Sequence, residues 1–128
     1  MAEASYPDDL KYHTEHDWAR IDGDTATLGI TWYAQDQLGE VVFFDPPAVG
    51  TTIAKDSPYA EVESVKAVSD AIAPLSGEIV EVNEALKDSP EQINEDSYGE
   101  GWLVKIKLAD PSEADSLLDA ESYRSSLS

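Results

Sequence analysis

Short segments of alternating apolar and polar residues make up much of the chain, and turn residues separate them. In the clearest case, residues 18–21 and 25–30 flank the dipeptide Asp22-Gly23. Two such segments joined through Asp-Gly predict a β-hairpin, because glycine tolerates the positive φ of the turn. The same criteria predict further strands at residues 40–45, 51–54, 59–64, 68–73, 78–82 and 102–108.

Helical signals are short and lie between or after these strands. A helix over residues 32–38 is predicted, because Thr31 can cap it and Gly39 can end it. The remaining signals predict one turn capped by Asn83, a loop over residues 88–101 with one turn beginning at Pro90, a helix opened by Asp110-Pro111, and a last helical piece over residues 120–127.

About seven short strands at close spacing, with helices at the end, predict a mainly β fold: a small β sandwich or barrel. Strands do not alternate with long helices, so a parallel α/β sheet is not expected. The length of 128 residues suits one domain, and no linker rich in proline, glycine or serine divides the chain. We therefore expect a single domain over residues 1–128, with a flexible N-terminus over residues 1–9.

Charge and composition exclude several classes of function. The chain holds 8 Lys and Arg against 27 Asp and Glu, a net charge of −19, which argues against binding to nucleic acid or to anionic membranes. It has no cysteine, so a disulfide framework, a thiol nucleophile and a Cys-type zinc site are excluded. No signal or transit peptide and no membrane span are visible, which favours a bacterial cytoplasmic protein, or one of the mitochondrial matrix if eukaryotic.

Common catalytic motifs are missing: the chain contains no P-loop, no GxGxxG, no GxSxG and no HExxH. His13 and His16, with Glu15 and Asp17 beside them, could form a metal site or a general base. No third ligand stands at a recognisable spacing, so we interpret them as part of a polar segment that leads into the first strand. Most carboxylates are interpreted as a solvated surface, and the three tryptophans as core or rim residues.

Lys66 differs from the other charged residues because it is the only Lys or Arg between Asp56 and Leu86, a stretch with seven acids. It lies where the two strands predicted at residues 59–64 and 68–73 meet. An isolated amine at the tip of a hairpin is exposed, held by a rigid scaffold and suited to modification by another protein. The alternative from composition alone is an ordinary surface lysine that offsets local negative charge.

The run Glu61-Val-Glu-Ser-Val-Lys-Ala-Val-Ser-Asp70 strongly resembles the lipoylation hairpin of the H protein family of the glycine cleavage system. Agreement extends over roughly residues 10–123. The other matching segments, in order, are Lys11-Tyr12, His16-Asp17-Trp18, Leu28-Gly-Ile-Thr31, Tyr33-Ala-Gln35, Leu38-Gly-Glu40, Pro74-Leu-Ser-Gly-Glu78, Val82-Asn83 and Tyr98-Gly-Glu-Gly-Trp102.

This resemblance implies a two-sheet β sandwich of the biotinyl/lipoyl carrier type with a C-terminal helical segment. It implies lipoic acid attached covalently to Lys66 through an amide, on a carrier that is not itself an enzyme. The implied partners are glycine decarboxylase (P protein), the tetrahydrofolate-dependent aminomethyltransferase (T protein), dihydrolipoamide dehydrogenase (L protein), and a lipoate ligase or lipoyl transferase. The carrier is expected to be a monomer.

The family holds its loaded arm in a surface cleft, and the resemblance places three residues of this chain there. Two are Ser69 and Asp70, just past Lys66; the third is Asp17 of the His-acid-Trp motif, where the family commonly has glutamate. Gln37 stands where some members carry a histidine, so no ionisable role transfers to it.

Other functions stay open at this stage. A biotin carrier would place methionines beside the lysine, whereas Val65 and Ala67 stand there, and lipoyl domains of 2-oxo-acid dehydrogenases are shorter and tethered by flexible linkers. An H-like protein that relays lipoyl groups to other enzymes is a close alternative. An acidic interaction module with unmodified Lys66 is a more distant one. A hydrolase using paired carboxylates comes last, because no pair stands out.

Overall fold

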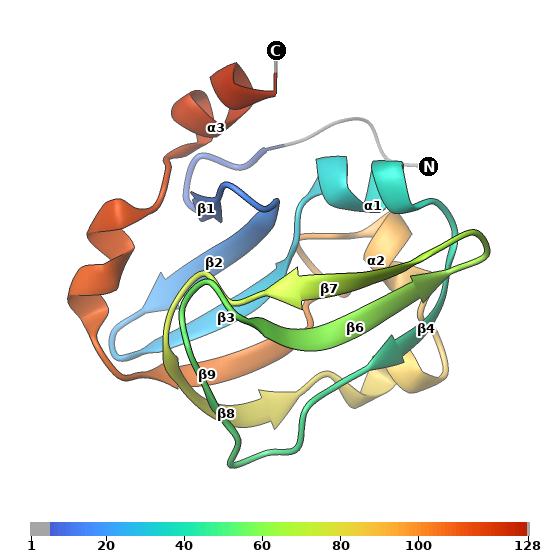
Figure 1. Cartoon of the computed structure of the whole chain (residues 1–128), viewed down its shortest axis with the longest axis horizontal. Coiled ribbons are helices and arrows are strands. Elements are labelled where there is room, and N and C mark those ends of the chain that lie inside the picture. Colours follow the sequence, from blue (N-terminus) through green and yellow to red (C-terminus); the bar gives the residue numbers. More distant parts are fainter. Residues whose placement is uncertain (1–5, 128) are drawn as a thin grey trace.

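The computed structural model describes residues 6–127, which form two antiparallel sheets with short helices around them (Figure 1). In spatial order, the larger sheet consists of β1 (Lys11–His13), β2 (Asp17–Asp22), β3 (Thr25–Ile30), β9 (Val104–Leu108), β8 (Gly77–Val82) and β5 (Thr52–Ile53). The smaller sheet consists of β4 (Val41–Asp45), β6 (Pro58–Ser64) and β7 (Val68–Ile72). The mainly β, two-sheet expectation is therefore confirmed.

The main core lies between the two sheets. Leu28, Ile79 and Ile106 from the larger sheet and Phe44 and Val62 from the smaller one belong to one cluster of buried side chains. A second cluster of buried side chains lies around Trp18, where residues near the N-terminus pack against residues near the C-terminus. Its buried members are Leu10, Tyr12, Trp18, Ala120 and Tyr123. Burial on one face of each strand follows from the period-two alternation that the sequence shows.

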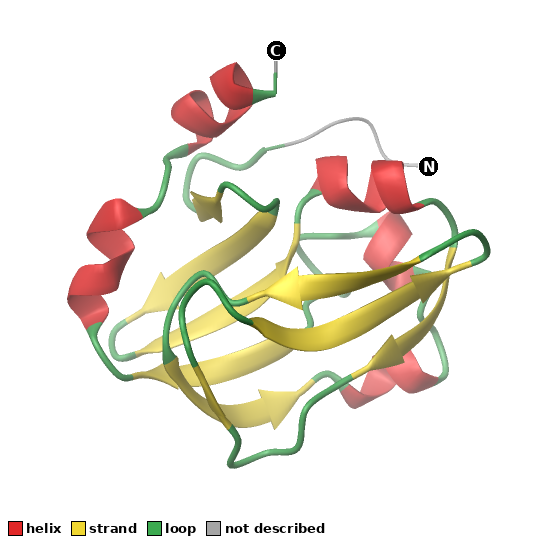
Figure 2. Ribbon diagram, viewed as in Figure 1, coloured by secondary structure: helices red, strands yellow, loops and turns green. Residues whose placement is uncertain are grey.

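The helices are short and lie at the ends and rim of the sheets, as Figure 2 shows in red. They are α1 (Trp32–Leu38), the 3₁₀ turn η1 (Glu84–Lys87), α2 (Gln92–Glu95), the 3₁₀ helix η2 (Pro111–Ser116) and α3 (Ala120–Ser126). At the start of α1, the Thr31 hydroxyl accepts the Ala34 N–H (3.2 Å), and Gly39 ends the helix with a φ of +88°. No helix within residues 6–127 has both the length and the apolarity to cross a bilayer.

Several predicted elements differ from the observed ones. Strand β1 was not expected; it has only three residues, too few for a periodic pattern, and its pairing with β2 defines it. The loop predicted over residues 88–101 contains the four-residue helix α2, which is the single turn expected after Pro90. Asn83 precedes η1 but does not cap it, because its side-chain amide instead donates to the carbonyls of Glu100 and Trp102, both at 2.8 Å.

The expectation of a flexible N-terminus concerns residues 1–9, of which residues 1–5 lie outside the described part of the chain. Within the described part, the Tyr6 ring meets the Tyr123 ring of α3 edge-on, with centroids 5.5 Å apart. The flexibility of this segment and the single-domain assignment stay predictions.

Candidate functional site

Lys66 lies at the tip of the β6–β7 hairpin, which crosses the molecule and reaches the C-terminal end of α1 (Figure 1). Ser64 organises this tip, because its hydroxyl oxygen accepts the backbone N–H groups of Lys66 (3.2 Å) and Ala67 (3.0 Å). The Ser64 N–H closes the turn by donating to the Ala67 carbonyl (2.7 Å). Hydrogen bonds therefore fix the backbone of the tip at Lys66. The hairpin tip lies between the two strands, as the sequence predicted.

The exposed side chain of Lys66 runs across Gly39 at the end of α1. A Cβ added to Gly39 would approach Cε of Lys66 to 3.2 Å, so the missing side chain leaves room for the stem of the lysine. The neighbouring Val65 N–H donates to the Glu40 carbonyl (3.0 Å), which fastens the tip to the same loop. Within residues 6–127, the Lys66 amine makes no ion pair.

Two adjoining hollows lie beside the hairpin. The larger, about 330 Å³, is walled by the turn before β2, by α1 and by the start of β7; its residues are Glu15, His16, Tyr33, Ala34, Gln37, Leu38, Ala67, Val68 and Ser69. The smaller, about 30 Å³, adds residues from β2 and β7, among them Asp17 and Asp70, and shares Ser69 with the larger one. Lys66 lines neither hollow, but its neighbour Ala67 lines the larger one.

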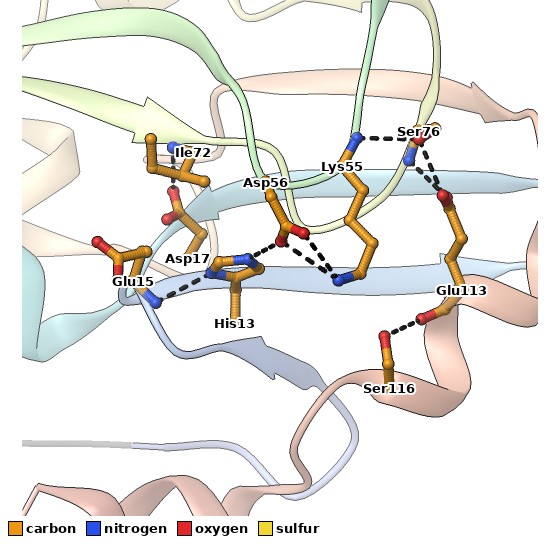
Figure 3. A network of polar contacts seen from close by, with 9 residues as sticks. All are labelled: His13, Glu15, Asp17, Lys55, Asp56, Ile72, Ser76, Glu113 and Ser116. Carbon is orange, nitrogen blue, oxygen red and sulfur yellow. Dashed lines mark hydrogen bonds and ion pairs between the residues drawn. The ribbon is translucent and has the colours of Figure 1, made fainter.

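Asp17 lies on β2 at the wall of the smaller hollow and is only 1% exposed. Its Oδ1 accepts the backbone N–H of Ile72 (3.2 Å), which joins the larger sheet to β7 (Figure 3). Burial raises the pKa of Asp17 well above its usual range, and the hydrogen bond from Ile72 opposes that effect only in part. A buried carboxyl in this state favours its proton until a cationic group arrives.

Ser69 and Asp70 are both exposed on β7, and both border the smaller hollow that Asp17 also borders. The structure therefore brings together the three residues that the sequence assigned to the arm cleft. Their assignment to an arm stays a prediction, since geometry alone does not identify a ligand.

His16 was missed as a residue of this site. It adopts a left-handed backbone conformation, with a φ of +76°, and lines both hollows. Its Nδ1 is 2.7 Å from the Tyr123 hydroxyl of α3, and its ring lies 4.6 Å from the Tyr33 ring. Burial lowers the pKa of His16, which favours the neutral imidazole. Its place beside Asp17 in the His-acid-Trp motif was the available signal.

His13 lies in β1 and is buried, so it is not part of a polar lead-in segment as interpreted from the sequence. Its Nδ1 accepts the Glu15 N–H (3.0 Å), so Nε2 carries the proton and donates to Asp56 (2.6 Å), as Figure 3 shows. The hydrogen bond from His13 lowers the pKa of Asp56, and Lys55 adds to the effect. This network holds the turn before β2 against the β5–β6 connection.

The two histidines therefore belong to separate networks. Nowhere in the described range, residues 6–127, do three or more His, Asp or Glu side chains gather as a metal site.

Comparisons with known proteins point to one family. The family model described as "Glycine cleavage H-protein" matches residues 10–128. The glycine cleavage system H protein of Bacteroides thetaiotaomicron is 53% identical over 120 residues, covering 94% of this chain and 95% of the relative. That of Symbiobacterium thermophilum is also 53% identical over 120 residues, covering 94% of each chain.

A solved structure agrees as well. The crystal structure of a glycine cleavage system H protein from Mycobacterium marinum superposes with a TM-score of 0.85 at 42% sequence identity, covering 93% of this chain and 96% of the other. With a family model spanning nearly the whole sequence and relatives near half identity, the chain belongs to the glycine cleavage H-protein family.

Proposed function

We propose that this protein is a lipoyl carrier of the glycine cleavage system and that Lys66 is its attachment residue. The observation that carries the proposal is the position of Lys66: an exposed amine, without an ion pair within residues 6–127, on a hydrogen-bonded hairpin tip in a chain of the H-protein family. Sulfur chemistry in a chain without cysteine must come from an attached group.

Attachment uses the Lys66 amine as a nucleophile. After losing a proton, Nζ attacks the carbonyl carbon of an activated lipoyl group, such as an acyl phosphate anhydride. A C–N bond forms, the bond from that carbon to the leaving group breaks, and the leaving group keeps the electron pair. A further proton leaves the nitrogen, which gives a neutral amide and changes the net charge of the protein from −19 to −20.

The hollows beside the hairpin fit a flexible arm that ends in a small polar group. The larger hollow has apolar side chains such as Ala34 and Leu38 along its wall, and it leads from Ala67 toward Asp17, Ser69 and Asp70. When bound, the lipoyl group supplies a sulfur that accepts the aminomethyl group of glycine. Asp17 and Asp70 would hold a cationic end, and Ser69 would offer a hydroxyl.

The partners follow from the carrier role. Glycine decarboxylase (P protein) would load the carrier, the tetrahydrofolate-dependent aminomethyltransferase (T protein) would unload it, and dihydrolipoamide dehydrogenase (L protein) would reoxidise it. A lipoate ligase or lipoyl transferase would modify Lys66. In this proposal the carrier is a monomer, has no catalytic residues of its own, and positions one shared arm for all three enzymes.

Intact mass tests the attachment residue. Protein produced in lipoate-supplied cells with a lipoate ligase is expected to gain one lipoyl mass, and Lys66→Arg to gain none while keeping the charge. Lys105→Arg, on β9, serves as the matched control and should be modified like the wild type. Unmodified wild-type protein under these conditions would contradict the carrier proposal.

A reconstituted assay tests the pathway. With P protein and pyridoxal phosphate, the lipoylated carrier is expected to support exchange of bicarbonate into glycine, and Lys66→Arg is not. A carrier that is lipoylated but inert in this exchange would favour the alternative role of relaying lipoyl groups to other enzymes.

A further inference from the structure

Exposed apolar side chains gather around Lys66. Four valine and phenylalanine residues at this end of the smaller sheet are unusually exposed: Val42 (44%), Phe43 (53%), Val65 (67%) and Val68 (58%). Such a group of exposed apolar side chains marks an interaction site more often than single ones do. Val65 directly precedes Lys66, and Val42 and Phe43 follow the loop over which the lysine stem lies.

A β-bulge creates part of this apolar surface. Val41 pairs with Ser64 and is buried, whereas the next pair is Phe43 with Glu63, so Val42 is an extra residue in the edge strand β4. Regular alternation would turn Phe43 inward after an exposed Val42. The bulge instead leaves both side chains in solvent, and bulges commonly redirect side chains in this way.

Register across the three strands places the exposed residues in two rows. Phe43, Glu63 and Val68 are successive partners across β4, β6 and β7 and form the row nearer to Lys66. Asp45, Glu61 and Asp70 form the second row in the same way, and all three are exposed. Like charges directly opposite each other on a sheet cost stability, so this second row favours a ligand of opposite charge.

We name these residues the tip face: Val42, Phe43, Val65, Val68, Asp45, Glu61, Glu63 and Asp70. The sequences of β4, β6 and β7 contain no Lys or Arg, so Lys66 is the cation that the tip face adjoins. We propose that the tip face binds the enzyme that acylates Lys66, and that this enzyme offers an apolar hollow for Phe43 and Lys or Arg side chains for the acidic row.

How closely each partner must approach Lys66 distinguishes the acylating enzyme from the others, and here the inference rests on the proposed function. The acylating enzyme must bring its acyl donor within bonding distance of Nζ on a bare lysine. Its active-site rim therefore covers the tip and the residues next to it. Enzymes that act on the far end of the attached arm can stand farther off, because the arm spans the gap. Charge complementarity between an acidic row and a basic rim also accelerates encounter.

The first test is the rate at which apo protein is acylated by a purified lipoate ligase supplied with lipoate and ATP. Phe43→Ser is expected to lower kcat/KM about tenfold, mainly through KM, as loss of a buried aromatic anchor does at an interface. Val80→Ser is the matched control, since Val80 is as exposed as Val42 but lies on β8 of the larger sheet. The control should stay within about twofold of the wild type.

The acidic row is tested by the pair Asp45→Asn with Glu61→Gln. At low salt we expect this pair of substitutions to lower kcat/KM about tenfold as well. The difference from the wild type should shrink at high salt, because screening then weakens the attraction in the wild type too. The control pair removes two exposed charges elsewhere: Asp88→Asn with Glu121→Gln. Asp70 is left unchanged because it also borders the hollow assigned to the arm.

Binding without turnover provides the second measurement. In a Lys66→Arg background, titration calorimetry with the ligase should show a higher Kd for Phe43→Ser than for Val80→Ser. Wild-type kcat/KM and Kd in both tip-face variants would overturn the proposal, as would equal losses in the controls. Normal acylation with weakened binding to the decarboxylase would also overturn it, by assigning the tip face to another partner. No acylation of wild-type protein would instead contradict the carrier function itself.

Discussion

Asp17 and His16 border the same small hollow, and burial favours the neutral form of each. One is held by an N–H from β7, the other by the Tyr123 hydroxyl of α3, so neither side chain is free to turn toward bulk water. At these two residues the wall of the hollow therefore presents polar atoms without a fixed charge. Such a site costs less to bury than one with a bare carboxylate, yet it can ionise when a cation enters.

The raised pKa of Asp17 makes folding stability depend on pH. Its folded pKa exceeds the unfolded value of 3.8, so the native state keeps a proton that the unfolded state releases. Stability from this group is present at low pH and is lost as pH rises from 3.8 through the folded pKa. Asp17→Asn removes this loss, and its amide oxygen can still accept the Ile72 N–H.

Asp17→Asn is therefore expected to be more stable than the wild type at pH 7, with a difference that shrinks toward pH 4. One unit of pKa shift corresponds to about 1.4 kcal/mol, which sets the scale of the change. Urea denaturation of both proteins at several pH values measures it. A difference between the two proteins that does not change between pH 4 and pH 7 would contradict the raised pKa.

At the scale of elements, local signals predicted the parts of the fold that local interactions form. The β2–β3 hairpin, α1 between Thr31 and Gly39, and the tip at Lys66 all carry turn or cap residues that determine their ends. Strand β1 and the position of His16 had no such signal. Both depend on partners far along the chain: β1 bridges to Leu118, and His16 contacts Tyr123.

The residues of the candidate site likewise differ in how much of their arrangement the local sequence predicts. Lys66, Ser69 and Asp70 stand on one hairpin, so their relation was visible in a ten-residue motif. Asp17 was assigned from family resemblance alone, and its burial against Ile72 became visible only when β2 was packed against the smaller sheet. Tertiary contact, rather than sequence pattern, decides which polar residues share a hollow.

The pairing of β2 with β3 supplies a test at this scale. Trp18 is the cross-strand partner of Gly29, and a Cβ on Gly29 would lie 2.6 Å from three atoms of the fully buried indole. Gly29→Ala is expected to lower the free energy of unfolding by about 1–3 kcal/mol, because the indole cannot move without disturbing its packing. Chemical denaturation measures this change.

A second variant tests the cause of that loss. Trp18→Phe removes the atoms that a new Cβ would meet, so Gly29→Ala should cost clearly less in that background than in the wild type. Trp18→Phe is destabilising by itself, since the Trp18 Nε1–H donates to the Ser97 carbonyl (3.0 Å). Equal costs of Gly29→Ala in both backgrounds would show that the clash with Trp18 is not the reason.

At the scale of the whole molecule, the net charge of −19 opposes folding, and in the proposed carrier role it would assist docking to partners with basic surfaces. Several cations are already engaged with acids: Lys55 with Asp56, Lys87 with Glu84, Lys105 with Glu81 and Arg124 with Asp8. Each of these exposed pairs contributes little to stability. With 27 acidic residues and 8 Lys and Arg, most of the acidic residues have no cation to pair with. The folded chain therefore concentrates negative charge that the extended chain would spread out.

Salt should consequently act in opposite directions on stability and on docking. Screening of the self-repulsion is expected to raise Tm by several degrees between about 10 mM and 500 mM NaCl, since the Debye length falls from about 30 Å to a few ångströms. Over the same range, affinity for the three enzymes of the system should fall, because screening also weakens attraction to basic surfaces. Thermal melts and binding titrations on one sample measure both. If both quantities rose with salt, the acidic surface would act on stability alone, and docking would have to depend on the apolar contacts of the tip face.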